Sequence, residues 1–418
     1  MTGPALVTGG SGFVGACAVR ELVRRGQDVH VLLRDPARAW RLADIADRLT
    51  IHVGDLCDAD SVRHAVASSE AAVVLHLATH GAYENQSDAR TILDTNIVGT
   101  LHLLEAAADA DVRLFVQTGS SSEYGFRSEP MAESDRLDPN SVYAVAKSAQ
   151  THLGQLWTRR SAMPVVTLRL FSVYGPWEEP TRLIPTLLER ARRDLPLLLA
   201  SPDTVRDFVY VDDVVEAMLD FEYLSRLGGE TVNLGSGSET TLRDLVETVT
   251  RLLGSRSEVC WNAFPARAWD TNRWCADPRK AIERLGWSPR HSLRAGLRKT
   301  AAWLEERLAP SPPGFAGGEG RGAGGQDPSR NSSLSVGSGP PSPPTPPPPQ
   351  SRGERGEPAA RHIDLRAMSY TVRRTILDRS FEAGVGHIGS ALSVVEMLVA
   401  VWSVLRNPAT DDVDRDRF

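Results

Sequence analysis

The first 309 residues alternate short, continuous apolar runs with longer segments of helical periodicity. Continuous apolar runs are typical of strands buried on both faces, as in a parallel sheet covered by helices. The clearest helical segments are residues 91–108 and 140–160. The predicted strands are residues 5–7, 29–33, 49–53, 72–78, 114–118 and 165–170. This order predicts an α/β fold with a doubly wound parallel sheet.

The pattern ends abruptly at residue 310. Residues 310–358 hold 13 of the 27 prolines together with repeated Gly and Ser, and almost no large apolar side chain. Such a segment cannot bury enough surface to offset its ordering entropy, so a disordered linker is expected. Residues 359–418 regain a helical pattern. The predicted organisation is a large domain (1–309), a linker (310–358) and a short helical tail (359–418).

The composition of the chain argues against several classes of function. The 47 basic and 53 acidic residues give a net charge of −6 without a long block of one sign, which argues against a nucleic-acid binder. Four cysteines without a C-x-x-C pair or nearby histidines predict neither a disulfide framework nor a metal site. No signal peptide and no apolar run of membrane-spanning length is visible, so we expect no membrane contact and a cytoplasmic location.

A glycine-rich turn follows the first predicted strand and opens a helix. Gly9, Gly12 and Gly15 have the spacing in which backbone N–H groups approach a pyrophosphate and the helix packs closely on the strand. Phe13 and Val14 would begin that helix, whose N-terminus favours anions. A glycine triplet alone is weak evidence, but its position after the first strand predicts a dinucleotide site.

The end of the second predicted strand bears on cofactor choice. An acidic residue there normally holds the ribose 2′-hydroxyl, and this chain has Arg34 instead. A guanidinium suits a 2′-phosphate, so NADP(H) is favoured. The alternative is that Asp35 takes the ribose of NAD(H). After the third strand, Asp55 and Leu56 lie where an adenine amino group could be bound, although Asp55 could instead be a helix N-cap.

Three polar residues form the candidate catalytic group. Tyr143 and Lys147 are one helical turn apart and share a face, and Ser120 follows a predicted strand. An ammonium near the phenol favours the phenolate, which predicts that Tyr143 exchanges protons near neutral pH with Lys147 lowering its pKa. Ser120 would hold the substrate carbonyl or hydroxyl against Tyr143.

These features resemble the extended short-chain dehydrogenase/reductases that act on nucleotide sugars. The matching segments are residues 8–15, 54–56, 76–78, 96–100, 120–125, 143–147 and 169–176, followed by 206–213, 233–235 and 285–289 as a smaller substrate lobe. The resemblance implies a Rossmann-type domain in a homodimer, with Leu77, Ala78 and Asn96 beside the cofactor. It also implies that Arg206 and Arg267 hold the diphosphate of a nucleotide sugar, a surface ion pair being the alternative for each.

The segment after Ser120 distinguishes members of that group. In the resembling 4,6-dehydratases an acidic pair follows this position, whereas Ser121 and Ser122 stand here. Glu123 would reach the base position only if the loop slipped by one residue. Ser121, Ser122 and Ser172 are therefore expected beside the sugar, Ser172 replacing an asparagine common in the group. The resemblance favours a reductase of 4-keto-6-deoxy nucleotide sugars. An epimerase with tightly bound NAD is the alternative, ahead of a 4,6-dehydratase or a non-catalytic dinucleotide sensor.

The tail resembles a second family. Residues 376–401, including His387, are similar to the N-terminal start of transketolase-type enzymes. That resemblance implies a transketolase-like partner subunit. Thiamine diphosphate is not expected to bind this fragment alone, because its carboxylates lie only at the extreme end of the chain, where no metal cage is evident. The alternative is a helical tail with one incidental histidine.

Overall fold

The computed structural model describes residues 3–83, 85–263 and 272–308. Arg267, the predicted linker and the predicted tail lie outside these residues, so the domain scheme beyond residue 308 stays a prediction. All structural statements below concern the described part of the chain.

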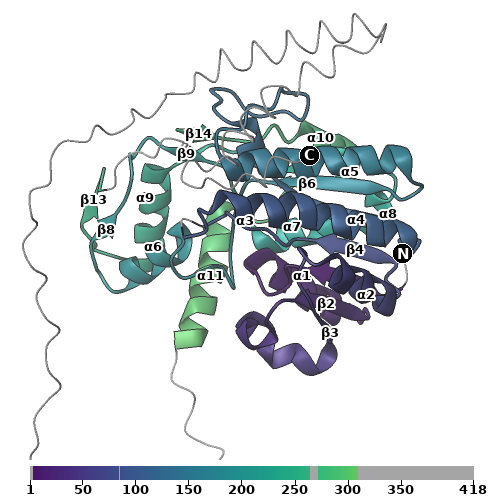
Figure 1. Cartoon of the computed structure of the whole chain (residues 1–418). Helices are drawn as coiled ribbons and strands as arrows, with labels where there is room; N and C mark the ends of the chain where they lie inside the picture. Colours follow the sequence, from purple (N-terminus) through teal and green to yellow (C-terminus); the bar gives the residue numbers. More distant parts are fainter. Residues whose placement is uncertain (1–2, 84, 264–271, 309–418) are drawn as a thin grey trace, which may run out of the picture. The chain divides into compact units, whose positions relative to one another are not determined.

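A seven-stranded sheet organises this part, with every neighbouring pair of strands parallel (Figure 1). The strand order is β11-β6-β5-β4-β1-β2-β3. The strands are β1 Ala5–Thr8, β2 Val29–Leu33, β3 Thr50–Val53, β4 Val73–His76, β5 Leu114–Ser120, β6 Val165–Leu170 and β11 Thr231–Leu234. The predicted doubly wound α/β class is confirmed.

Alternate residues of the central strands enter two different cores. Val7 and Val31 pack on one face with α1 (Phe13–Arg24) and α7 (Val211–Met218). Leu6 and Leu32 pack on the other face with α2 (Ala59–Ser69) and α4 (Gly99–Asp109). Each fully buried Val or Leu contributes about 1.5–3 kcal/mol, which explains why continuous apolar runs form these strands.

A smaller lobe has its own apolar core, to which three helices and two short strands contribute together with Tyr174, Phe208 and Tyr210. These elements are α6 Leu183–Arg192, α9 Leu242–Leu253, α11 Leu293–Leu308, β8 Leu197–Leu198 and β13 Val259–Cys260. The remaining elements are η1 Pro36–Arg38, η2 Trp40–Arg48, α3 Ala89–Leu93, η3 Asp94–Val98, η4 Ser121–Tyr124, α5 Val142–Arg160, β7 Ser172–Tyr174, β9 Val205–Arg206, β10 Phe208–Tyr210, α8 Phe221–Leu224, β12 Thr240–Thr241, β14 Arg273–Trp274 and α10 Arg279–Leu285.

Three sequence-based expectations were wrong in detail. The strand at residues 49–53 is an exposed edge strand, with Val53 68% exposed, because β3 has a neighbour on one side only. Residues 233–235 were assigned to the smaller lobe, but β11 extends the main sheet beside β6. Trp287, in the segment 285–289 assigned to the same lobe, is buried in the main core and donates its indole N–H to the Asp213 carbonyl.

The helix predicted at residues 91–108 is interrupted. Between α3 and α4 the chain forms the π-helical turn η3, which contains the buried Asn96. Such turns often occur at functional sites.

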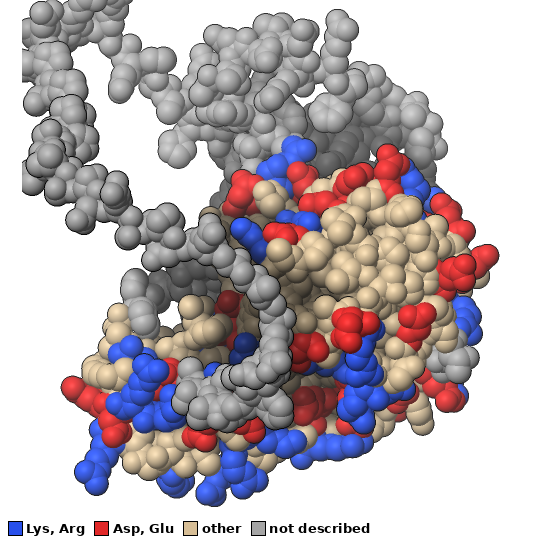
Figure 2. Space-filling view, turned by 90° about the horizontal axis from the view of Figure 1, so that it is seen from below, with Lys and Arg blue, Asp and Glu red and all other residues tan. Residues whose placement is uncertain are grey.

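The described surface carries no dominant charge on the face that Figure 2 shows, where acidic and basic side chains are interspersed. No described helix is long and apolar enough to cross a bilayer. Within the described residues, no cluster of three or more His, Cys, Asp or Glu could hold a metal ion.

Candidate active site

The turn between β1 and α1 requires glycine at two positions. Gly9 has a φ of +73°, and a Cβ there would lie 2.4 Å from the backbone nitrogen of Ala78. A Cβ on Gly15 would lie 2.1 Å from the Gly9 carbonyl oxygen. Both distances are far shorter than a van der Waals contact, so the turn packs directly against the 77–78 segment after β4.

The same turn exposes the N-terminus of α1. Gly12 is the N-cap and supplies no side chain to cap the helix. The first intrahelical bond to it comes from Ala16 N–H, at 2.9 Å, so the N–H groups of Phe13, Val14 and Gly15 have no partner inside the helix. Unpaired N–H groups and the helix dipole together favour an anion, and this cradle fits a dinucleotide pyrophosphate.

Arg34 lies at the carboxyl end of β2 and is exposed, and within the described residues its guanidinium forms no hydrogen bond or ion pair. Asp35, in contrast, is engaged. One carboxylate oxygen accepts the Ala37 N–H at 3.0 Å, and the other lies 3.4 Å from Arg38 Nε. The strand end therefore presents a cation, and the carboxylate that would hold a ribose caps η1 instead.

Asp55 and Leu56 follow β3. Asp55 Oδ1 accepts the Cys57 N–H at 2.9 Å, whereas the N-cap of α2 is Asp58. The N-cap alternative for Asp55 was therefore wrong, and its proposed contact with adenine stays a prediction. Leu56 is buried, and its carbonyl is 2.9 Å from His102 Nδ1.

Asn96 fixes the segment after β4 through hydrogen bonds to its backbone. Its amide oxygen accepts the His80 N–H at 2.8 Å, and its amide nitrogen donates to the His80 carbonyl at 2.7 Å. The Thr79 hydroxyl donates to the same amide oxygen at 3.3 Å. Asn96 thus orders the chain just beyond Leu77 and Ala78, which border the glycine turn.

His76 supports the same strand end, although the sequence analysis assigned it no role. Its ring is fully buried, with Nδ1 2.7 Å from the Thr8 hydroxyl and Nε2 2.8 Å from the Thr100 hydroxyl. Burial lowers the pKa of His76 to about 3, so the ring is neutral. A polar residue ending an apolar strand was the signal available in the sequence.

The structure brings Ser120 and Tyr143 together, as predicted. Ser120 ends β5, Tyr143 lies in the first turn of α5, and the side chains of Ser120 and Thr79 both act to lower the pKa of the phenol. Burial nevertheless raises the pKa of Tyr143 above its ordinary value of 10. The net shift of this pKa is upward, with burial as its largest cause, so the lowering expected from Lys147 stays a prediction. Tyr143 is therefore a protonated donor at neutral pH.

Lys147 is buried beside this pair. Its Nζ donates to the Thr118 carbonyl at 2.5 Å and to Gln150 Oε1 at 2.8 Å. Burial lowers the pKa of Lys147 to about 8, and the charge of Glu123 opposes this shift. Because an ammonium has three donors, one N–H remains for a further acceptor.

Glu123 cannot act as the base that elimination of water would need. It is fully buried, and Oε1 accepts the Ser120 N–H at 2.8 Å. Oε2 accepts from the Thr151 hydroxyl at 2.8 Å and pairs with Arg169 at 2.9 Å. The carboxylate therefore holds the backbone of Ser120 in place.

The two serines that precede Glu123 are close to Ser120. Ser121 is buried in η4, and the Ser122 N–H donates to the Ser120 hydroxyl at 3.2 Å. Neither side chain is a carboxylate, so the loop offers no acid–base pair for elimination.

The smaller lobe places Arg206 at a cavity of about 210 Å³. Its guanidinium lies over the Trp274 ring at 4.6 Å, and Nη1 donates to the Val205 carbonyl at 2.9 Å. The other residues around this cavity are Leu183, Leu198, Leu199, Ala200, Thr204 and Leu242. Ser172 is partly buried at the start of β7, and its N–H donates to the Asp207 carbonyl at 3.0 Å.

The loop at residues 175–182 adds groups that the sequence analysis missed. Glu178 is 7% exposed, and its Oε2 has no hydrogen-bond partner among the described residues. Burial raises the pKa of Glu178 to about 8, against the opposing charge of Arg182. Arg182 lies 5.7 Å from the Tyr83 ring centre, and its charge lowers the pKa of Tyr143 slightly. Through this charge the loop acts electrostatically on Tyr143.

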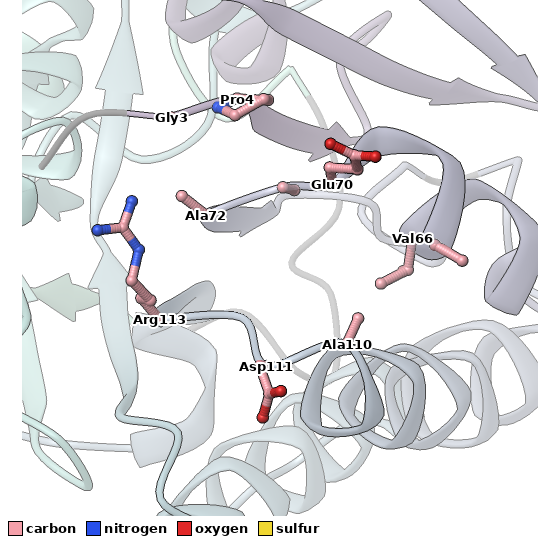
Figure 3. Close-up of a pocket in the computed structure, with 10 residues that line it drawn as sticks. Gly3, Pro4, Val66, Glu70, Ala72, Ala110, Asp111 and Arg113 are labelled. Atoms are coloured by element: carbon pink, nitrogen blue, oxygen red, sulfur yellow. The ribbon is translucent and has the colours of Figure 1, made fainter.

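A second cavity, of about 530 Å³, lies at the amino-terminal ends of the strands, beside the segments that lead into β1, β4 and β5 (Figure 3). Glu70, Asp111 and Arg113 are among the residues around it. Ligands of open parallel sheets bind at the carboxyl ends of the strands, so this cavity is separate from the candidate active site.

Known proteins share both the sequence and the fold of this region. The family model described as "NAD dependent epimerase/dehydratase family" matches residues 5–235. The chain is 29% identical to dTDP-glucose 4,6-dehydratase 1 of Escherichia coli K12 over 333 residues, covering 71% of this chain and 91% of that protein.

Two solved UDP-glucose 4-epimerases have the same fold. The Thermotoga maritima enzyme, solved with UDP-glucose, is 27% identical with a TM-score of 0.67. The Thermus thermophilus enzyme, solved with NAD, is 28% identical with a TM-score of 0.66. Each alignment covers 73% of this chain and 100% of the solved one. With the glycine cradle and the Ser120, Tyr143 and Lys147 group in place, the chain belongs to the NAD dependent epimerase/dehydratase family.

Proposed function

We propose that the protein reduces the carbonyl of a 4-keto-6-deoxy nucleotide sugar. The observation that carries this proposal is the loop after β5, where Ser121 and Ser122 stand in place of an acidic pair and both oxygens of Glu123 are already bonded. The phenol of Tyr143, next to this loop, is protonated at neutral pH. A protonated phenol suits reduction, in which the carbonyl oxygen must gain a proton. Glu123 is fully engaged with Arg169 and Thr151, which leaves no free carboxylate in the loop that follows Ser120.

Ser120, Tyr143 and Lys147 have separate roles in the proposed reaction. Ser120 holds the carbonyl oxygen against the Tyr143 hydroxyl, which donates its proton to that oxygen. Lys147 uses its remaining N–H to hold the nicotinamide ribose. A bound nicotinamide dinucleotide supplies the hydride, and the glycine cradle with Phe13 and Val14 would hold its pyrophosphate.

NADP(H) is the proposed cofactor. The exposed Arg34 guanidinium and the engaged Asp35 carboxylate support this choice, because a 2′-phosphate needs a cation and a ribose 2′-hydroxyl an acceptor. NAD(H), found in the Thermus relative, is the alternative. Arg34→Ala should weaken use of NADPH about tenfold, one charge-assisted contact, and leave NADH unchanged. Equal use of both cofactors before and after the substitution would refute the role of Arg34.

The nucleotide sugar would span both parts of the site. Arg206, at the apolar cavity of the smaller lobe, is proposed to hold the diphosphate, since a guanidinium pairs with phosphate bidentately. Arg267 keeps the same predicted role, outside the described residues. Ser121, Ser122 and Ser172 are proposed to lie beside the sugar ring.

The decisive experiment offers the purified protein a 4-keto-6-deoxy nucleotide sugar with NADPH deuterated at the transferred position. Reduction yields a product that carries one deuterium and consumes one NADPH. An NDP-hexose offered with NAD⁺ should not lose water. A product lighter by the mass of one water molecule would refute the proposal and indicate a dehydratase.

An epimerase that retains NAD is the second candidate, favoured by the two UDP-glucose 4-epimerases of the same fold. It would interconvert two nucleotide sugars with no net use of added cofactor and no deuterium in the product. The same experiment therefore separates the two candidates.

A further inference from the structure

Arg41 joins three segments of chain that are distant in sequence. It lies in η2 and is 5% exposed. Its Nη1 donates to the Ser11 carbonyl, in the glycine turn, at 3.3 Å. Its Nε donates to the Trp177 carbonyl at 2.7 Å, and Nη2 donates to Glu179 Oε2 at 2.6 Å. One guanidinium thus links the proposed cofactor turn to the 175–182 loop.

The loop end of this link is a backbone that needs support. Trp177 has a φ of +71°, a left-handed conformation that costs a non-glycine residue about 1–3 kcal/mol unless its surroundings hold it. The carbonyl of this residue is the one that accepts from Arg41 Nε. Arg20 lies 3.9 Å from the Trp177 ring centre and donates to the Arg41 carbonyl at 2.6 Å. Arg41 and Arg20 therefore hold both the backbone and the ring of Trp177.

The held loop carries Glu178, whose Oε2 has no partner among the described residues, and Arg182, whose charge acts on Tyr143. A shift of the glycine turn on binding an anion would move Ser11, and Arg41 would pass that shift to the loop. We propose that Arg41 is a positioning residue that makes binding of the dinucleotide and of the nucleotide sugar cooperative. The proposal rests on the proposed function, since it needs both ligands in this site.

The test measures the coupling factor between the two ligands. NADPH is titrated into the full-length protein, with its fluorescence as the signal, with and without saturating UDP-glucose or dTDP-glucose, whichever binds the wild type more tightly. The wild type should bind NADPH at least about fivefold more tightly with the sugar present, the lower end of typical coupling. Arg41→Gln should reduce this factor to about one while changing the affinity for NADPH alone less than about threefold.

Arg48→Gln is the matched control. Arg48 lies on the same element and donates to the Val23 carbonyl at 2.9 Å, with no contact to the 175–182 loop. Its coupling factor should equal that of the wild type. Arg41→Lys keeps the charge without the planar fork and should fail to restore coupling. Glu179→Gln, at a carboxylate with a side chain 38% exposed, should lower the factor without endangering the fold.

The outcomes separate two kinds of failure. The role of Arg41 is refuted, while the proposed function stands, if the wild type binds both ligands without coupling between them. It is also refuted if the coupling persists in Arg41→Gln and Glu179→Gln variants that are folded. If the wild type binds neither ligand, the assignment of the site itself is refuted, and the role of Arg41 falls with it.

Discussion

Two loops that act on the candidate site, one through contacts and one through charge, each contain a buried glutamate, but the two carboxylates differ in hydrogen bonding. In the loop after β5, both oxygens of Glu123 are bonded, to the Ser120 N–H, Thr151 and Arg169. In the loop after β7, Glu178 is almost as buried but has an oxygen without a partner among the described residues. A buried carboxylate whose oxygens are both hydrogen-bonded stabilises its loop, whereas burying a carboxylate oxygen without a partner costs free energy. The contrast indicates that the first loop holds the candidate catalytic group in place, whereas the second keeps a buried carboxylate oxygen without a partner among the described residues.

The largest expected effect tests the group that the first loop orients. Tyr143→Phe removes the proton donor and leaves the ring in place, so turnover should fall on the order of 10²- to 10⁴-fold. Steady-state kinetics on the keto sugar measure it, with the exposed Tyr223→Phe as the control. A variant that keeps more than about a tenth of the activity would show that Tyr143 is not the acid.

The second prediction concerns the hydrogen bonds and the ion pair of Glu123. Glu123→Gln leaves the buried Arg169 without its counter-charge, which should lower the free energy of unfolding by about 3–5 kcal/mol in urea titrations. Glu222→Gln, in an exposed ion pair with Arg226, should cost less than about 1 kcal/mol. Equal losses in the two variants would contradict the difference between the buried and the exposed carboxylate.

A smaller and pH-dependent effect is expected at Glu178. Burial raises the pKa of this carboxyl from 4.5 to about 8, so between these pH values the native state keeps a proton that the unfolded chain has lost. Stability from this group is therefore greatest at low pH and falls as pH rises towards 8. Glu178→Gln imitates the protonated form, so it should match the wild type near the unfolded pKa of 4.5 and be more stable above the folded pKa of about 8.

Melting temperatures across this pH range measure the difference between the two proteins. Glu222→Gln serves again as the control and should show no such trend. A Glu178→Gln variant that loses stability as pH rises relative to the wild type would mean that the charged carboxylate has a partner, and the contrast between the loops would disappear.

Removal of the residues after 309 should not change the activity. Both loops lie within residues 3–308, so a chain ending at residue 309 should keep the kcat and KM of the full chain. A large loss would show that the predicted tail contributes to the activity of the first domain. Calorimetry of the full chain with thiamine diphosphate and Mg²⁺ should likewise detect no binding, and saturable binding would overturn the prediction that residues 359–418 mark only a transketolase-like partner.

Local sequence was enough to predict the sheet, the glycine turn and the candidate catalytic group. Each depends on local spacing: apolar runs specify buried strands, Gly9 and Gly15 occupy positions where no Cβ fits, and Tyr143 and Lys147 share a helix face. Edge exposure of β3 and the place of β11 in the main sheet could not be read this way, because neighbours in a sheet are set by topology.

The roles of the charged groups depend on contacts that exist only in the folded chain. Glu123 and Glu178 are both glutamates beside aromatic residues in loops, and nothing local distinguishes them. Their difference comes from Arg169, 46 residues away from Glu123 in sequence, and from the lack of such a partner for Glu178 Oε2 among the described residues. The raised pKa of Tyr143 and the link made by Arg41 have the same origin, since burial and long-range contacts exist only in the folded chain.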